Sequence, residues 1–240
     1  MNQIVEDAVF GKECQQPPAI VLICLHADPI SAPGIGGGGG THSYLRELTA
    51  VLEGASISYI MLTRWADASL PEKVVLSRHG GLIRLDIGGR TSMDKRFLDD
   101  HHEISVKRIE EVLAHYGRPK LFHSIYWNSG RAAAELASRL KIPFFHTVIS
   151  NGKRRAIVSY DNHPPHRVTV EAQVFHAAAR IFCICNQERE DLLRLYDVPS
   201  ERISVVGRPV ASTFFVPCRN GYGEPRLSFS PTLQGIHNGS

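Results

Sequence analysis

The stretch LFHSIYWNSGRAAAELASRLKIPFFHT, residues 121–147, decides the fold. It opens and closes with mostly apolar runs, 121–125 and 142–147, of the length typical of buried strands. Residues 129–140 between them have the composition of a helix, with small alanine side chains that permit close packing on a sheet. Two strands separated by one helix of this length predict a βαβ unit with parallel strands.

The same alternation extends in both directions from this unit. Further strands are predicted at residues 19–25, 56–63, 74–76, 82–87, 180–185 and 203–206, and further helices at 41–53, 99–116, 168–179 and 187–196. Such spacing predicts an α/β fold, a single Rossmann-like, doubly wound, mostly parallel sheet. We place this domain at residues 19–217, after a flexible N-terminus at 1–18. Residues 218–240, rich in glycine and proline, are typical of a linker or disordered tail.

The composition argues against several classes of protein. A net charge of +3 is too small to indicate a nucleic-acid partner, and no apolar run approaches the roughly 20 residues that span a bilayer. No secretory signal peptide is recognisable. The five cysteines form no C-x-x-C pair, so we expect free thiols and no metal site in a cytoplasmic protein. No cofactor is predicted.

The segment Gly34-Ile35-Gly36-Gly37-Gly38-Gly39-Gly40 is the clearest local anomaly of the sequence. A backbone without Cβ atoms lets a ligand approach closely, and the segment leads into a predicted helix whose free N–H groups favour an anion. We therefore predict a phosphate or diphosphate ligand, with a flexible surface loop as the alternative.

Three classes of phosphate-binding protein have such a loop. A P-loop requires a lysine after the last glycine, where this chain has Thr41 and His42. A dinucleotide-binding fingerprint fits Gly34, Gly36 and Gly39 in spelling, but it lies too far from the first strand and lacks the acidic residue expected after the second. The third class is the glycosyltransferases, in which a glycine-rich loop after the first strand receives the donor's diphosphate.

Four stretches, in order, resemble the amino-terminal domain of the retaining glycosyltransferases that include sucrose-phosphate synthases and mycothiol-pathway N-acetylglucosaminyltransferases. They are GGGGGTHSYLRELTAVLEG (36–54), LFHSIYWNSGRAAAELASRLKIPFFHT (121–147), RVTVEAQVFHAAARIFCICNQEREDLLRLY (167–196) and VPSERISVVGRPVASTFFVP (198–217). They are similar to the family's Gly-Gly loop and helix, its H-x-H-Y-W-x-S-G turn, its R-x-x-x-E helix and its crossing to the second domain. The resemblance implies the N-terminal, acceptor-side half of a GT-B fold.

The resemblance also implies transfer of a sugar from a nucleotide-sugar donor to a small polyol, sugar or lipid acceptor. It places the diphosphate on the glycine loop and the acceptor on turns that follow strands. Candidate donor-binding residues are Gly36, Gly37, Gly38, Gly39, Gly40 and Thr41, and candidate acceptor-binding residues are Tyr126, Trp127, Asn128, Ser150, Asn151 and Lys153. The catalytic residues stay unassigned, with His42, His123 and His146 as candidates.

Several of these candidates have structural alternatives. Tyr126 and Trp127 either pack on a sugar ring or cover the sheet edge. Asn128 caps the next helix or binds a hydroxyl, capping being favoured. The basic residues 153–155 either neutralise a phosphate or form a solvated charge run.

Three departures from the family pattern weaken the expected site. The family's second turn histidine is Ile125 here, and the histidine that many members have after the next strand is Ile149. Residues 208–211 read RPVA where the family has N-G-V-D. A sugar- or phosphate-binding module without turnover is therefore an alternative. A dinucleotide-dependent oxidoreductase is a third, which depends on the glycine spelling alone.

In the family, a second Rossmann-like domain holds most of the donor nucleotide. Such a domain needs on the order of 150 residues, far more than follow Pro217. We therefore expect activity to require a C-terminal donor domain or a partner chain, and whether this chain is an enzyme by itself stays open. Association with a membrane surface is also left open, because many members use lipid-linked acceptors.

Overall fold

The computed structural model describes residues 17–30, 39–158 and 164–207, all within one compact unit. Its elements are β1 (Ile20–Ile23), α2 (Gly39–Gly54), β2 (Tyr59–Arg64), β3 (Lys73–Val75), β4 (Gly80–Leu85), the 3-10 helix η2 (Leu98–His101), α3 (His102–Tyr116), β5 (Leu121–Ile125), α4 (Trp127–Leu140), β6 (Phe144–Thr147), α5 (Gly152–Val158), α6 (Arg167–Ala177), β7 (Arg180–Cys183), α7 (Asn186–Tyr196), the 3-10 helix η3 (Ser200–Arg202) and β8 (Ile203–Val205). The predicted N-terminal segment and tail fall almost entirely outside the described residues, so these boundaries stay predictions.

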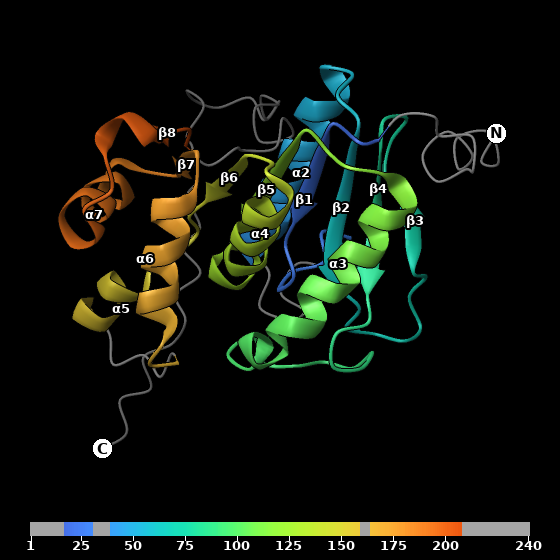
Figure 1. Ribbon diagram of the computed structural model, residues 1–240, viewed down its shortest axis with the longest axis horizontal. Coiled ribbons are helices and arrows are strands. Elements are labelled where there is room, and N and C mark those ends of the chain that lie inside the picture. Colours follow the sequence, from blue (N-terminus) through green and yellow to red (C-terminus); the bar gives the residue numbers. More distant parts are fainter. Residues whose placement is uncertain (1–16, 31–38, 159–163, 208–240) are drawn as a thin grey trace, which may run out of the picture. The chain divides into compact units, whose positions relative to one another are not determined.

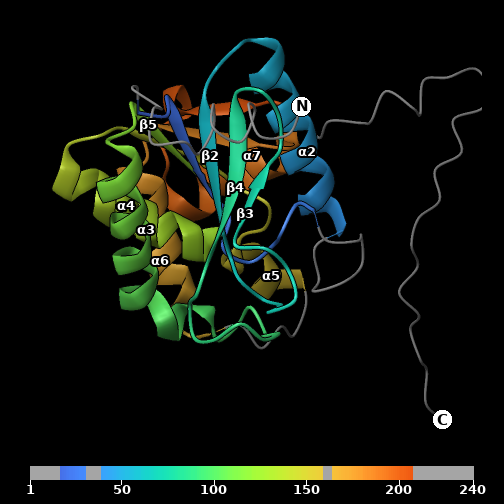
Figure 2. The same cartoon turned by 90° about the vertical axis from the view of Figure 1, so that its right-hand side faces the viewer.

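The eight strands form one sheet in the order β3-β4-β2-β1-β5-β6-β7-β8. All neighbours are parallel except β3 and β4. Helices α3, α4 and α6 cover one face of the sheet and α2 covers the other, while α7 lies beside β7 and β8 (Figures 1 and 2). The predicted Rossmann-like, mostly parallel α/β fold is confirmed.

The side chains of the central strands are divided between two apolar cores. In β1, Val21 and Ile23 pack on the side of α3 and α4, whereas Leu22 packs on the side of α2 with Leu45 and Met61. Because parallel strands are buried on both faces, β1 is a continuous apolar run in the sequence. Among the described cysteines, Cys24 and Cys183 are buried free thiols, as predicted, and Cys185 is exposed.

Several element boundaries differ from the sequence-based expectation. The strand predicted over 19–25 ends early because the amide of Leu25 donates to Ser129 Oγ at 3.0 Å and leaves the ladder. Helix α2 begins at Gly39, two residues before the predicted start at residue 41. Helix α5 was not predicted, since its seven residues are too few to show an apolar period.

The small residues of α4 permit close contact with α6. A Cβ atom built on Gly130 would lie 2.6 Å from Val174 Cγ1 and 2.9 Å from His146 Cε1. Both distances are shorter than real contacts allow, so the glycine of the W-N-S-G turn is required by packing.

We expect Gly130→Ala to lower the free energy of unfolding by about 1–3 kcal/mol, because the core must shift to admit a methyl group. Gly54→Ala is the matched control, since nothing lies within 4 Å of the corresponding Cβ. Urea denaturation of the two variants measures the difference, and equal midpoints would contradict the packing argument.

Two histidines are buried within the sheet. His123 Nε2 lies 2.7 Å from Thr147 Oγ1, which is 2.9 Å from the hydroxyl of Tyr44 on α2. His146 Nδ1 lies 2.9 Å from Ser124 Oγ on the opposite face. Burial lowers the pKa of His123 from 6.5 to about 4 and, together with the nearby His123, that of His146 to about 3. Both imidazoles are therefore neutral in the folded protein at neutral pH.

These histidines predict acid lability. In the unfolded chain their pKa returns to about 6.5, so below that pH the unfolded state binds more protons than the folded state. Stability is then fully present above about pH 7 and falls by up to about 1.4 kcal/mol per pH unit for each histidine as the pH drops toward 4. Urea denaturation at pH 7.5 and 5 measures this loss, and the double variant His123→Gln, His146→Gln should lose less. A double variant with the wild-type pH dependence would refute this account.

Candidate functional site

A cavity of about 460 Å³ lies at the carboxyl ends of the central strands, the lower edge of the sheet in Figure 1. It is lined by segments that follow β1, β4, β5 and β6 and by the starts of α2 and α6. The chain leaves β1 and β5 in opposite directions, toward β2 and toward β6. In open α/β sheets such a switch point is where ligands bind, so we take this cavity as the candidate site.

Two aromatic rings from the switch point stand side by side in the cavity. His26 follows β1 and Tyr126 follows β5, and their ring centroids are 4.5 Å apart. Burial and the positive charge of Lys95, with a smaller effect of His42, lower the pKa of His26 to about 3. His26 is therefore a neutral imidazole that can donate one hydrogen bond and accept another.

The backbone of Tyr126 is strained where it precedes α4. Its φ of 72° and ψ of 154° lie in a region that only glycine adopts readily. Such strain is concentrated at functional sites, where the surrounding structure imposes it. Here the phenol ring, which is 7% exposed and packs in the core, forms part of the cavity wall beside the guanidinium of Arg167, whose Cζ lies 5.3 Å from the ring centroid.

Arg167, the first residue of α6, brings a buried positive charge to the cavity wall. Its side chain is 3% exposed, and its Nε donates to Glu171 Oε1 at 2.7 Å. Its Nη2 donates to Ser150 Oγ at 2.9 Å. No partner among the described residues accepts from Nη1, although the residue lines the cavity. A guanidinium held in this way has a free donor for an anionic ligand.

The remaining charged residues of the lining give the cavity a positive balance. They are Lys95, Arg96 and Arg155, against the carboxylate of Asp94. Asp94 is bound to Arg96, with Oδ2 at 2.7 Å from Nη2. Lys95 lies on a loop that is far from Arg167 in the sequence, and its Nζ is 5.8 Å from the Tyr126 ring centroid. The arrangement suits a phosphate group attached to a small polar molecule.

The structure brings together some of the residues predicted from the sequence. Gly40 and Thr41 line the cavity at the start of α2, and Tyr126, Trp127 and Ser150 line it from the strand ends. Gly39 opens α2, whereas Gly36, Gly37 and Gly38 lie outside the described residues. The cavity therefore contains candidates from both the donor set and the acceptor set.

Other acceptor candidates lie elsewhere. The prediction that Asn128 caps α4 is wrong: the residue preceding the helix is Tyr126, and both amide atoms of Asn128 are buried without a hydrogen-bond partner in the described structure. Asn151 Oδ1 accepts from the amide of Arg154 at 2.8 Å and so begins α5. The ammonium of Lys153 donates to the carbonyl of Leu195 and lies 4.7 Å from the Tyr196 ring centroid, away from the lining.

The three histidine candidates for catalysis do not line the cavity. His123 and His146 are hydrogen-bonded within the sheet, and His42 is buried in the first turns of α2, where burial lowers its pKa. The sequence reasoning missed His26, Lys95 and the cavity role of Arg167. His26 follows an apolar strand directly, so the rule that selected the other turns also applies to it.

Only one of the two isoleucine departures reaches the cavity. Ile125 is fully buried in the core beneath α2, with Tyr44 and Leu45, whereas Ile149 lines the cavity. The change at residue 125 therefore removes no polar group from the cavity wall. Ile149 does supply an aliphatic wall beside Thr41 and Ser150.

The end of β2 argues against a dinucleotide site. The buried Arg64 stands there and donates to the carbonyls of Ile87, Gly89 and Thr91 at 2.8, 2.9 and 2.5 Å. A carboxylate for a ribose is expected at this position. The arginine instead fixes the loop that leads toward Lys95.

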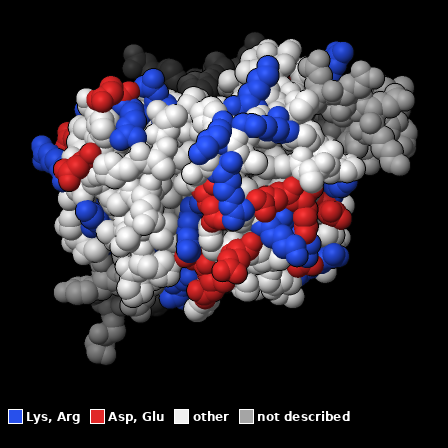
Figure 3. Space-filling model, viewed as in Figure 1, with Lys and Arg blue, Asp and Glu red and all other residues white. Residues whose placement is uncertain are grey.

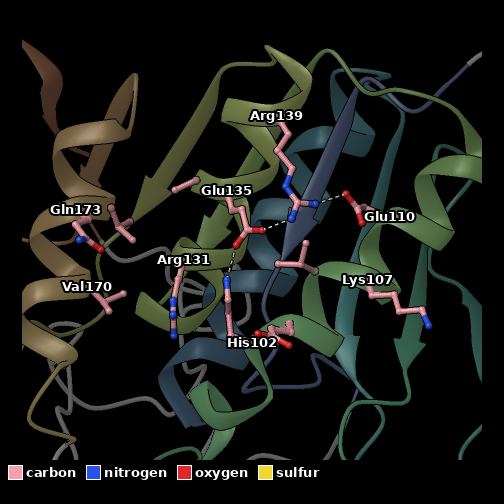
Figure 4. Close-up of a pocket in the computed structure, with 12 residues that line it drawn as sticks. His102, Lys107, Glu110, Arg131, Glu135, Arg139, Val170 and Gln173 are labelled. Carbon is pink, nitrogen blue, oxygen red and sulfur yellow. Dashed lines mark hydrogen bonds and ion pairs between the residues drawn. The ribbon is translucent and has the colours of Figure 1, made fainter.

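A larger cavity, of about 650 Å³, lies among α3, α4 and α6. Glu135 accepts from His102 Nε2 at 2.6 Å and from Arg139 Nη2 at 2.6 Å, and Arg139 also binds Glu110 (Figure 4). Acidic and basic side chains alternate over this face (Figure 3). Because these charges satisfy one another and lie away from the strand ends, we assign the site to the smaller cavity.

No group of three or more His, Cys, Asp or Glu side chains among the described residues is placed to hold a metal ion. Nor is any helix in that part of the chain long and apolar enough to cross a membrane.

Comparison with known proteins bears on the identity of this site. The glycosyl transferase 4-like domain family matches residues 39–209. The chain is 28% identical to the D-inositol 3-phosphate glycosyltransferase of Kribbella flavida, over 84% of this chain and 50% of that protein. It is 30% identical to D-inositol 3-phosphate glycosyltransferase 2 of Catenulispora acidiphila, over 84% and 48%.

Among solved structures, sucrose-phosphate synthase from Thermosynechococcus elongatus superposes with a TM-score of 0.76 and 27% identity, over 84% of this chain and 50% of that one. The chain thus spans about half the length of the curated relatives it matches. The family match covers well over half of the chain and includes the cavity segments from α2 to α6. The chain therefore belongs to the glycosyl transferase 4-like family and has the fold of an N-terminal glycosyltransferase domain.

Proposed function

We propose that the chain is the acceptor-side half of a nucleotide-sugar glycosyltransferase, and that its acceptor is a small polyol or sugar bearing a phosphate. The observation that carries the proposal is the buried Arg167, held by Glu171 and with no partner for Nη1 among the described residues, in one cavity with Lys95. Two cations around an unfilled space favour a doubly charged ligand.

The names of the relatives support a phosphorylated acceptor. One group is named for D-inositol 3-phosphate, and the similar solved structure is a sucrose-phosphate synthase. A lipid-linked acceptor at a membrane surface is the alternative, and the charged lining of the described cavity favours it less.

The donor's diphosphate belongs, in this proposal, at the start of α2. Gly40 and Thr41 line the cavity there, and a helix of 16 residues has an N-terminus with free N–H groups and positive potential. The acceptor phosphate on Lys95 and Arg167 then lies across the same cavity from the diphosphate. One site holds both substrates with their charges separated.

The residues between these two anions orient the acceptor. The exposed part of the Tyr126 ring contacts a polyol or sugar ring, and the neutral imidazole of His26 bonds to one of its hydroxyls. In the reaction, the acceptor oxygen bonds to the anomeric carbon as the bond from that carbon to the diphosphate breaks, and the proton of the acceptor hydroxyl leaves with the diphosphate. Orientation of the acceptor is the contribution of this half to the rate.

A second domain supplies the remaining wall of the site. The chain covers about half of its relatives, and glycosyl transfer depends on a cleft that closes and excludes water. We propose that a donor domain, on this chain's natural continuation or on a partner, completes the enzyme. A binding module without turnover is the second candidate, favoured by the aliphatic Ile149 in the cavity wall.

We expect the purified chain to bind D-inositol 3-phosphate at least about tenfold more tightly than inositol, since charge-assisted hydrogen bonds contribute about 1.5–3 kcal/mol. Lys95→Met should remove most of this preference, because it deletes a cavity cation on an exposed side chain that folding does not need. Calorimetric or NMR titration measures both affinities.

Lys107→Met is the matched control, because Lys107 lines the larger cavity among the helices. Titrations with UDP and NADH belong to the same series. A wild-type chain without preference for the phosphate, or one that binds NADH more tightly than UDP, would overturn the proposal.

A further inference from the structure

The two cations of the proposed phosphate site lie on separate segments of the chain. Lys95 lies on the loop between β4 and η2, and Arg167 begins α6. One carboxylate stands between these segments. Asp99, four residues after Lys95 in η2, accepts at Oδ2 from Nε2 of His166 at 2.8 Å. His166 immediately precedes Arg167, so this hydrogen bond joins the two segments.

Two further contacts hold Asp99 and His166 against the wall of the cavity. Arg131 on α4 donates from Nη1 to the same Oδ2 atom, which makes Asp99 a three-way junction of η2, α4 and α6. The ring of His166 meets Trp127 edge to face, with centroids 5.9 Å apart, and Trp127 lines the cavity. The junction therefore adjoins the part of the cavity wall that Trp127 and Arg167 form.

The carboxylate of Asp99 is only half satisfied in the described structure. The side chain of Asp99 is 4% exposed, and its Oδ1 is buried without a partner among the described residues. A half-satisfied buried carboxylate costs free energy that an apolar side chain avoids. An interaction kept at such a cost indicates a role beyond packing.

We propose that Asp99 is a positioning residue that fixes the separation of Lys95 and Arg167, and so sets the site for the acceptor's phosphate. The inference rests on the proposed function for the identity of the ligand. Asp99 touches no substrate; it acts through His166 on one side and through the loop of Lys95 on the other. Without it, each cation keeps its charge but loses its fixed distance from the other.

The chain contains a matched control with the same chemistry. Glu135 also joins a histidine and an arginine across two helices, accepting from His102 and Arg139 in the larger cavity (Figure 4). Its loss removes a more exposed charged junction between α3 and α4 and leaves the side chains of Lys95, Asp99, His166 and Arg167 unchanged.

The test compares Asp99→Asn and His166→Ala with Glu135→Gln. The readout is the ratio of the dissociation constant for inositol to that for D-inositol 3-phosphate. We expect this ratio to fall at least about fivefold in the first two variants, because small misplacements of binding groups weaken them strongly. It should stay at the wild-type value in Glu135→Gln. His166→Gln, which retains a donor for Asp99, should recover part of the ratio lost in His166→Ala.

A second readout requires no ligand. Hydrogen exchange of residues 94–101 and 166–171 should accelerate together in Asp99→Asn and in His166→Ala, and in neither segment of Glu135→Gln. Suppose that the wild type shows no preference for the phosphorylated ligand while hydrogen exchange of both segments accelerates together in the two variants. In that case the proposed function fails, but the coupling of the two segments through Asp99 is supported. If the ratio in Asp99→Asn equals that of Glu135→Gln, or if the two segments loosen independently, the positioning role is overturned.

Discussion

The buried ion pair between Arg167 and Glu171 is the interaction on which the site depends. Glu171 is fully buried, and besides Arg167 it accepts from the amide of Gly152 and the hydroxyl of Tyr196. Burial and the charge of Glu171 raise the pKa of Tyr196, so the phenol remains a donor. A carboxylate satisfied from three directions holds α5, α6 and α7 together, and a network of this kind is rigid only while it is complete. The guanidinium of Arg167 belongs to this network, and it is therefore held rigidly at the cavity.

The sequence predicted the fold well because local patterns determine it. Continuous apolar runs that alternate with helices indicate a parallel sheet, and both signals can be recognised locally, without knowledge of distant residues. It missed α5, whose start depends on the Asn151 side chain, and it wrongly made Asn128 a cap, because the neighbouring Tyr126 takes that position in an unusual backbone conformation. Boundaries of this kind depend on single hydrogen bonds that composition does not reveal.

The site was predicted less completely, because its residues meet only in three dimensions. Turns after strands were identified, and Tyr126, Trp127 and Ser150 do meet at the cavity. Lys95 comes from a loop without a motif, and the cavity role of Arg167 depends on which of its nitrogens remain unbound. The strand histidines His123 and His146, named as catalytic candidates, are hydrogen-bonded within the sheet and do not line the cavity.

At Tyr126 a strained backbone conformation is combined with a ring that packs in the core. A φ of 72° costs a non-glycine residue on the order of 1–3 kcal/mol, whereas glycine adopts it readily. A glycine here would relax the backbone but would remove from the core a ring that is only 7% exposed. Loss of a buried aromatic ring costs about 3–5 kcal/mol, more than the strain. The packing of the ring therefore offsets the strain, and the same ring forms part of the cavity wall.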